Sequence, residues 1–142
     1  MIVSSAALAP APPVTSALVE LANAERTRAR LGRLRPNARL MEAALLQAEQ
    51  IAKAGRVAHT LEGAKYPTLR DRVDKVDYEW SAIGENLAFG QRSARDVTRV
   101  WMRSAGHRAN ILNAQFTEIG TAYVVDRRGV PYYVQVFARP KT

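Results

Sequence analysis

The chain has 142 residues and no cysteine, and 47% of its residues are hydrophobic against 24% that are charged. This size and composition fit one globular domain that buries a core without disulfide bonds, and they exclude a disordered chain and a disulfide-rich scaffold. The formal net charge is +8, which favours anionic partners.

The first 14 residues differ in composition from the rest. They combine small apolar residues with Pro10, Pro12 and Pro13, and Ala7-Leu8-Ala9 resembles a signal-peptidase site without a basic segment before it. Proline-rich segments of this kind are extended and have no core of their own. We therefore expect residues 1–14 to be an arm or signal-peptide remnant, and residues 15–142 to form one domain. No stretch reaches the ~18 apolar residues that a membrane-spanning helix needs.

Helical spacing of apolar residues predicts two helices in the first half of the domain. The first begins at a cap on Thr15 or Ser16 and ends at Gly32. The second follows the Pro36-Asn37 break, carries the clearest 3.6-residue stripe of the chain and ends at Gly55. Capping residues at the start and glycine after the end are the expected boundaries of such helices.

Two shorter helices are predicted further along. One has Pro67 in its first turn, where the missing proline N–H has no helical partner to lose. The other begins at Ser93-Ala94-Arg95-Asp96, which resembles a capping box, and ends near Gly106.

The last third of the chain changes to a two-residue period. A β-hairpin is predicted here, with one strand over the alternating residues around Ile119 to Val125, a turn over Asp126 to Pro131, and a second strand from Tyr132 to Phe137. A further strand is expected over residues 83–89. Early amphipathic helices must cover the apolar face of a late antiparallel sheet, so the fold class is α+β.

The chain has only two histidines, His59 and His107, and each lies just beyond the predicted end of a helix. One interpretation is structural, because imidazole interacts well with the negative end of a helix and is also satisfied within a core. The other is a metal site, although no third His or Cys completes a recognised zinc pattern.

Two carboxylates add weight to the metal site. Glu85 stands in Gly84-Glu85-Asn86-Leu87 between apolar residues, and a buried carboxylate demands a partner, for which a histidine is suitable. Glu118 alternates with Ile119 at the start of the hairpin, so it faces the opposite layer or an exposed strand edge.

The arginines gather between Arg26 and Arg39, with Arg28, Arg30, Arg33 and Arg35 between them. Such a run is either a solvated helix face and loop or a surface that binds an anionic polymer. No aromatic residues interleave with it and no nucleic-acid motif accompanies it, so nucleic acid is not the expected partner.

Several segments occur together in a family-specific order. These are Leu21-Ala22-Asn23-Ala24-Glu25-Arg26, Ala58-His59-Thr60, Gly84-Glu85-Asn86-Leu87, Trp101 to Ser104, Gly106 to Leu112, Phe116 to Gly120 and Tyr133 to Phe137. Over roughly residues 15–140 the chain resembles the bacterial CAP domain, the cysteine-rich secretory protein, antigen 5 and pathogenesis-related 1 superfamily of SCP-like extracellular proteins.

That resemblance implies a three-layer α-β-α sandwich around a small central antiparallel sheet, in a secreted or periplasmic monomer. It also implies a cleft in which His59 and His107 bind a divalent metal, zinc in some members, beside Glu85. Glu118 belongs to the bacterial variant of the motif and is a cleft candidate. Plant and animal relatives place a second carboxylate where this chain has Ser104, and their disulfides are absent.

Three functions follow. The first is an extracytoplasmic binding module for a metal and an apolar or cell-envelope ligand, without catalysis, since the sequence offers no cysteine and no Gly-x-Ser-x-Gly nucleophile. The second is a metal-dependent hydrolase with Glu85 or Glu118 as general base. The third is a polyanion-binding surface over Arg26 to Arg39. Two imidazole ligands alone predict modest zinc affinity that falls below about pH 6.

Overall fold

The computed structural model describes residues 13–142, so residues 1–12 of the predicted arm lie outside the described residues. The described helices and strands follow one another as α1 (Val14–Arg28), β1 (Arg35–Pro36), α2 (Ala38–Ala54), α3 (Leu69–Lys75), β2 (Trp80–Phe89), α4 (Ala94–Met102), α5 (Ala105–Ile111), β3 (Glu118–Val125) and β4 (Pro131–Pro140). Among residues 13–142, no helix combines the length and apolar character needed to cross a bilayer.

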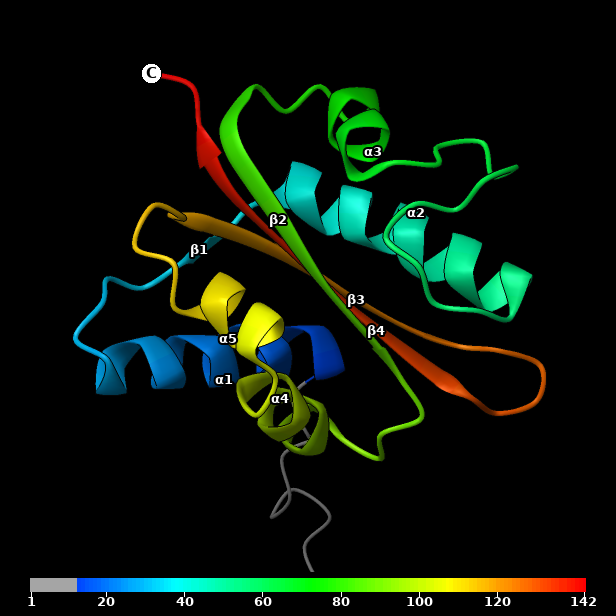
Figure 1. The fold of residues 1–142 in the computed structure, drawn as a ribbon, viewed down its shortest axis with the longest axis horizontal. Coiled ribbons are helices and arrows are strands. Elements are labelled where there is room, and N and C mark those ends of the chain that lie inside the picture. The colour runs from blue at the N-terminus through cyan, green and yellow to red at the C-terminus, as the bar shows by residue number, and fades with distance from the viewer. Residues whose placement is uncertain (1–12) are drawn as a thin grey trace, which may run out of the picture.

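The helices cover both faces of one sheet, which gives the predicted α-β-α sandwich (Figure 1). Helices α2 and α3 pack on one face, and α1, α4 and α5 pack on the other. The strand order is β1-β3-β4-β2. Strand β4 is antiparallel to both of its neighbours, as predicted, whereas the two-residue β1 pairs in parallel with β3 and makes the sheet mixed.

Strand β4 lies at the centre of the fold because both of its faces are covered. Val134 and Val136 face the layer of α2, and Tyr133 and Phe137 face the layer of α1, α4 and α5. All of these side chains are buried. A strand buried on both sides needs apolar residues at successive positions rather than at alternate ones, and residues 132–138 have this character except at Gln135.

Gly120 allows the first turn of α2 to lie directly on β3. A Cβ atom at this position would lie 2.0 Å from the backbone carbon of Leu40, a distance that no side chain tolerates. The glycine in the Glu118-Ile119-Gly120 motif therefore fixes how closely the helix approaches the sheet.

The predicted helices exist, but two of their starts are displaced. Helix α1 begins after Pro13, whose φ of −55° suits a helix entry and whose carbonyl accepts the first helical bond from Ala17, so neither Thr15 nor Ser16 is its cap. Consequently Val14, assigned to the arm, belongs to the domain. Pro67 lies outside α3, because Thr68 caps it with Asp71 in a reciprocal capping box.

The helix ends also differ from the prediction. Helix α1 stops at Arg28 rather than Gly32, because Arg30 already has a positive φ of 62°. The predicted helix from Ser93 to Gly106 is two helices, since the chain turns at Arg103 and a new helix begins after Ser104. The short α5 buries only Ile111 and so shows no apolar stripe in the sequence.

Candidate functional site

Glu85 is the most deeply buried carboxylate of the predicted site. It lies in the middle of β2, and its side chain is only 1% exposed. Its oxygens lie 3.1 and 3.3 Å from Nη2 of Arg72, whose side chain is 0% exposed. A buried carboxylate is costly unless it is paired and hydrogen-bonded, so this ion pair is what makes a buried acid acceptable in the middle of β2.

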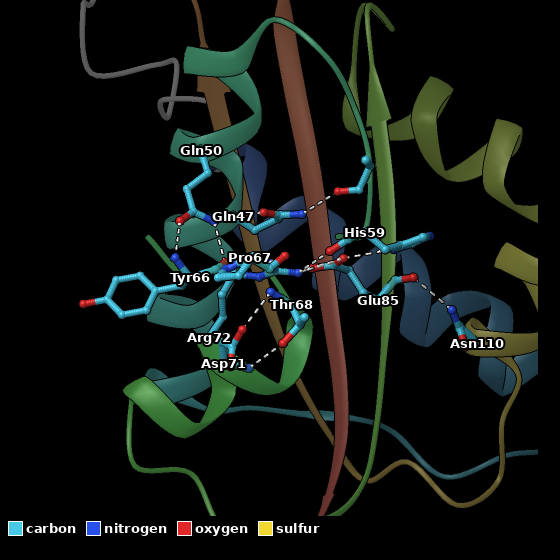
Figure 2. A network of polar contacts seen from close by, with 11 residues as sticks. Gln47, Gln50, His59, Tyr66, Pro67, Thr68, Asp71, Arg72, Glu85 and Asn110 are labelled. Atoms are coloured by element: carbon cyan, nitrogen blue, oxygen red, sulfur yellow. Dashed lines mark hydrogen bonds and ion pairs between the residues drawn. The ribbon is translucent and has the colours of Figure 1, made fainter. Parts of the chain in front are cut away.

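Arg72 is held in place by α3 and by three backbone carbonyls. Its Nη1 donates to the carbonyls of Tyr66 and Pro67 at 3.0 and 2.9 Å, and its Nη2 donates to that of His59 at 3.0 Å. The capping box at Thr68 fixes the start of the helix that carries it. Figure 2 shows the guanidinium pointing from α3 toward Glu85 and the loop of His59. Arg72 therefore joins the carboxylate and the histidine loop in one network.

His59 lies in the loop after α2, as predicted, and contacts Glu85. Its Nδ1 is 3.0 Å from Oε1 of Glu85, and its side chain is 61% exposed. The hydrogen bond to Glu85 is the main cause that raises the pKa of His59 above its ordinary value, against burial and the charge of Arg72, which lower it. The loop is also fixed by Gln47 of α2, whose amide donates to the carbonyl of Ala58 (Figure 2).

The ring nitrogens of His59 thus have different roles. In the neutral ring, with Nδ1–H donated to the carboxylate, Nε2 carries the lone pair. A carboxylate that orients a histidine in this way is the usual arrangement behind metal-binding imidazoles.

His107 lies inside α5, not beyond the end of a helix as the sequence indicated. Asn86 of β2 donates to the backbone carbonyl of His107 at 3.1 Å. Asn110, one turn further along α5, donates to the carbonyl of Glu85 and to the side chain of Asn86 at 3.1 and 2.9 Å. These bonds fasten α5 to the strand that carries Glu85.

The ring of His107 has an unsatisfied nitrogen. Among residues 13–142, Nδ1 of His107 is buried and has no hydrogen-bond partner. Burial is the main cause that lowers the pKa of His107, and the charge of His59 adds to it. The two imidazoles are therefore close enough to influence each other electrostatically.

Glu118 is not joined to the histidines. It accepts a hydrogen bond from the Tyr78 hydroxyl at 2.6 Å, and its other oxygen lies 4.0 Å from Nη2 of Arg35. Burial and Glu118 together raise the pKa of Tyr78. Glu118 and Tyr78 line an open cavity of about 1000 Å³ to which neither histidine belongs. The structure thus separates Glu118 from the other predicted site residues.

The arginine run is not one continuous surface. Arg26 is 2% exposed, and it donates to the backbone carbonyls of Gly32, Ile111, Asn113 and Phe116. Its assignment to a solvated or polyanion-binding run was wrong, because it ties α1 to the segment between α5 and β3. Of the exposed arginines, Arg28 pairs with Glu25 and Arg33 pairs with Glu20.

Sequence reasoning missed Arg72, which is the strongest partner of Glu85. A signal was present, since Leu69, Arg72, Val73 and Val76 recur at three- and four-residue spacing and place this arginine on the apolar side of its helix. Asn86 and Asn110 were also missed as partners, although both stand within quoted motifs. A charged or amide side chain within an apolar stripe is the pattern that identifies such residues.

Among the described residues of the predicted site, the two imidazoles are the candidate donors for a metal ion. Among residues 13–142, no group of three or more His, Cys, Asp or Glu side chains is arranged to hold a metal. Nε2 of His59 and the orphaned Nδ1 of His107 are nitrogen donors, and nitrogen suits zinc. Glu85 already serves Arg72 and His59, so it orients a ligand rather than binding a metal itself.

Comparison with known proteins gives consistent relatives. The uncharacterized protein YkwD of Bacillus subtilis is 35% identical over 107 residues, which cover 75% of this chain and 41% of YkwD. An extracellular protein containing an SCP domain from Bacillus anthracis has 26% identity and a TM-score of 0.81, with 93% of this chain and 45% of that chain covered. The chain thus spans less than half of either relative.

Two other solved structures share the fold at lower identity. An outer surface protein from Borrelia burgdorferi has a TM-score of 0.81 and 23% identity, covering 89% of this chain and 92% of that one. A structure of NaASP2 with Zn²⁺ has a TM-score of 0.62 and 11% identity, covering 89% and 83%.

The family itself follows from the length of the sequence match. The model of the CAP, or cysteine-rich secretory protein, family matches residues 19–137, from within α1 to within β4. That range contains the Glu85 network, both histidines and Gly120. This chain belongs to the CAP (cysteine-rich secretory protein) family.

Proposed function

We propose that this chain is an extracytoplasmic binding domain in which the imidazoles of His59 and His107 hold a divalent cation, zinc above all, without catalysis. One observation carries the proposal. The ring of His59 is oriented through Nδ1 by a buried carboxylate, and that carboxylate is itself held by a fully buried arginine. This arrangement fixes an exposed imidazole with its second nitrogen free to bind.

The second ligand is supported by the state of His107. Burial lowers its pKa, so the ring is neutral at neutral pH and offers a lone pair. Its buried Nδ1 gains a partner if it binds a cation or a bound water, and an unpaired buried nitrogen costs about 1–3 kcal/mol. When bound, zinc held by two imidazoles keeps positions open for water or a further ligand.

Catalysis is not part of the proposal because Glu85 is a poor general base. Its oxygens are already occupied by the guanidinium of Arg72 and by the N–H of His59. A base must reach the proton that it removes and have an acceptor oxygen free. Glu118 accepts a hydrogen bond from Tyr78 and lies in a cavity that neither histidine lines.

The location is supported by relatives of the same fold. One is named as an outer surface protein and another as an extracellular protein. A chain without cysteine works in an oxidising compartment as well as in a reducing one, because it depends on no disulfide.

Calorimetric titration with Zn²⁺ at pH 7.5 and pH 5.5 tests the proposal. The parent is expected to bind one ion at pH 7.5 and much less at pH 5.5, where the histidines take up protons. His59→Ala combined with His107→Ala abolishes binding, whereas the matched control Glu118→Gln retains it. Unchanged binding by the double variant would refute the site. Hydrolysis of a peptide or ester panel that chelator stops and zinc restores would refute the absence of catalysis.

A further inference from the structure

A second surface, distinct from the histidines, is formed at one corner of the molecule. Here the C-terminal end of α2, the end of β2 and the turn between β3 and β4 come together (Figure 1). We call it the hairpin corner and define it by Lys53, Phe89, Val125, Arg127, Arg128 and Tyr132. These residues line an open cavity of about 970 Å³, and neither histidine does.

The hairpin corner leaves large apolar side chains in solvent. Phe89 is 56% exposed and Val125 is 48% exposed, which puts both among the most exposed large apolar residues of the described chain. The ring of Phe89 stacks on Tyr132 at a centroid distance of 6.2 Å, and the Tyr132 hydroxyl donates to Asp126. A rigid aromatic group that is supported from beneath and exposed above is typical of an interaction surface.

The charges around this apolar surface are mostly positive. Lys53, Arg127 and Arg128 line it, and among residues 13–142 none of them forms an ion pair. Asp126 forms no ion pair with them, and its carboxylate accepts the backbone N–H groups of Arg128 and Val130 and the Tyr132 hydroxyl, but it keeps its negative charge. The other acid in the lining is Glu49, so three cations against two acids leave the hairpin corner with a net charge of +1.

Exposed apolar side chains surrounded by free cations match the chemistry of one occupant, the surface of an anionic bilayer. We propose that the hairpin corner docks on a membrane containing anionic lipids, with Phe89 and Val125 entering the headgroup layer and the three cations facing phosphates. Aromatic and aliphatic side chains supply the apolar part of such binding, and each nearby cation strengthens it about fivefold. This inference is independent of the proposed cation site.

Flotation with vesicles tests the docking. The full chain is expected to bind vesicles of about 30% phosphatidylglycerol in phosphatidylcholine and not pure phosphatidylcholine. Arg127→Glu with Arg128→Glu weakens binding at least about 25-fold, as expected from about fivefold for each cation. The matched control is Arg103→Glu with Arg108→Glu, exposed positions at the end of α4 and on α5 with the same change in net charge, which changes binding much less.

Insertion has its own readout in Phe89→Trp, whose fluorescence should shift to the blue on anionic vesicles as the indole leaves water. Phe89→Ser should weaken binding, while the exposed control Val100→Ser leaves it unchanged. Thermal melting of each variant checks that the fold is retained. Equal losses in the two arginine pairs, full binding by Phe89→Ser, or no blue shift would overturn the proposal, since binding would then reflect net charge alone.

Discussion

Breaking the buried ion pair of Glu85 gives the sharpest test of the structure. In Arg72→Met, the side chain keeps its apolar stem but loses the charge and all of its N–H donors. The carboxylate of Glu85 remains buried with His59 as its remaining partner, and three carbonyls lose a donor. Removing one partner of a buried pair costs about 3–5 kcal/mol.

That loss is large for a domain of this size, whose whole stability is about 5–15 kcal/mol. An unfolding entropy of about 2.1 cal/mol/K for each residue converts it to a fall in melting temperature of about 10–17 °C. Removing both charges together, in Arg72→Met with Glu85→Met, leaves no buried charge alone and should cost less than the two single losses added.

Urea unfolding of the parent, the two single variants and the double variant measures this coupling. A second readout is the pKa of His59 by proton NMR, because the charge of Arg72 lowers that pKa and Glu85 raises it. Arg72→Met should therefore raise the pKa of His59, whereas Glu85→Gln should lower it. Additive losses of stability, or a loss below about 1 kcal/mol in Arg72→Met, would refute the buried pair.

Three further outcomes follow from particular contacts. By NMR, His59 should titrate above its ordinary pKa and His107 below its own, and the reverse order would contradict the site. The stability that protonated His59 contributes is present below about pH 6.5 and is lost as the pH rises through the raised pKa. Gly120→Ala should lower the free energy of unfolding in urea by about 3 kcal/mol or more, because its Cβ meets the backbone of Leu40. The control Gly32→Ala has open space around it and should leave that free energy unchanged, so similar values for both variants would contradict the close approach of the helix. Asn110→Ala removes the hydrogen bonds to the carbonyl of Glu85 and to the side chain of Asn86. It should lower the free energy of unfolding by about 1–3 kcal/mol and increase amide hydrogen exchange along α5. Unchanged exchange would show that other contacts hold α5.

Periodicity was sufficient for the α+β class because the main elements carry strong signals, whereas the three-layer arrangement was implied by the resemblance to the CAP domain. The stripe of α2 was read with its correct boundaries at Asn37 and Gly55, and the alternation around Ile119 to Val125 marks β3. The second strand of the hairpin is longer than the predicted Tyr132 to Phe137, since β4 spans Pro131–Pro140. The elements that were missed are short. β1 has two residues, and α5 has seven residues with one buried side chain, so neither is long enough to show a repeating pattern of hydrophobic residues.

The site was predictable in its residue types but not in its pairing. Burial of Glu85 between apolar neighbours correctly indicated a partner, and His59 is one of them. The stronger partner is Arg72, 13 residues before it. The contact depends on how α3 packs against β2, which local periodicity does not determine. For Glu118, the alternation correctly placed its side chain opposite that of Ile119. Its hydrogen-bond partner Tyr78 lies 40 positions away in the sequence, so the alternation could not identify it.

The pairing of Glu85 also limits what its neighbour can do. If His59 were the only partner of Glu85, the ion pair would exist only while the imidazole was protonated and would be lost when the ring became neutral. The contact of Glu85 with Arg72 does not involve the proton of His59, so Glu85 keeps its ion pair whatever the state of the histidine. His59 can then release a proton, or exchange it for a cation, without leaving a buried carboxylate unpaired. A ligand-binding imidazole on a stable acidic support is therefore a use to which this arrangement is well suited, and a proton-shuttling acid is not.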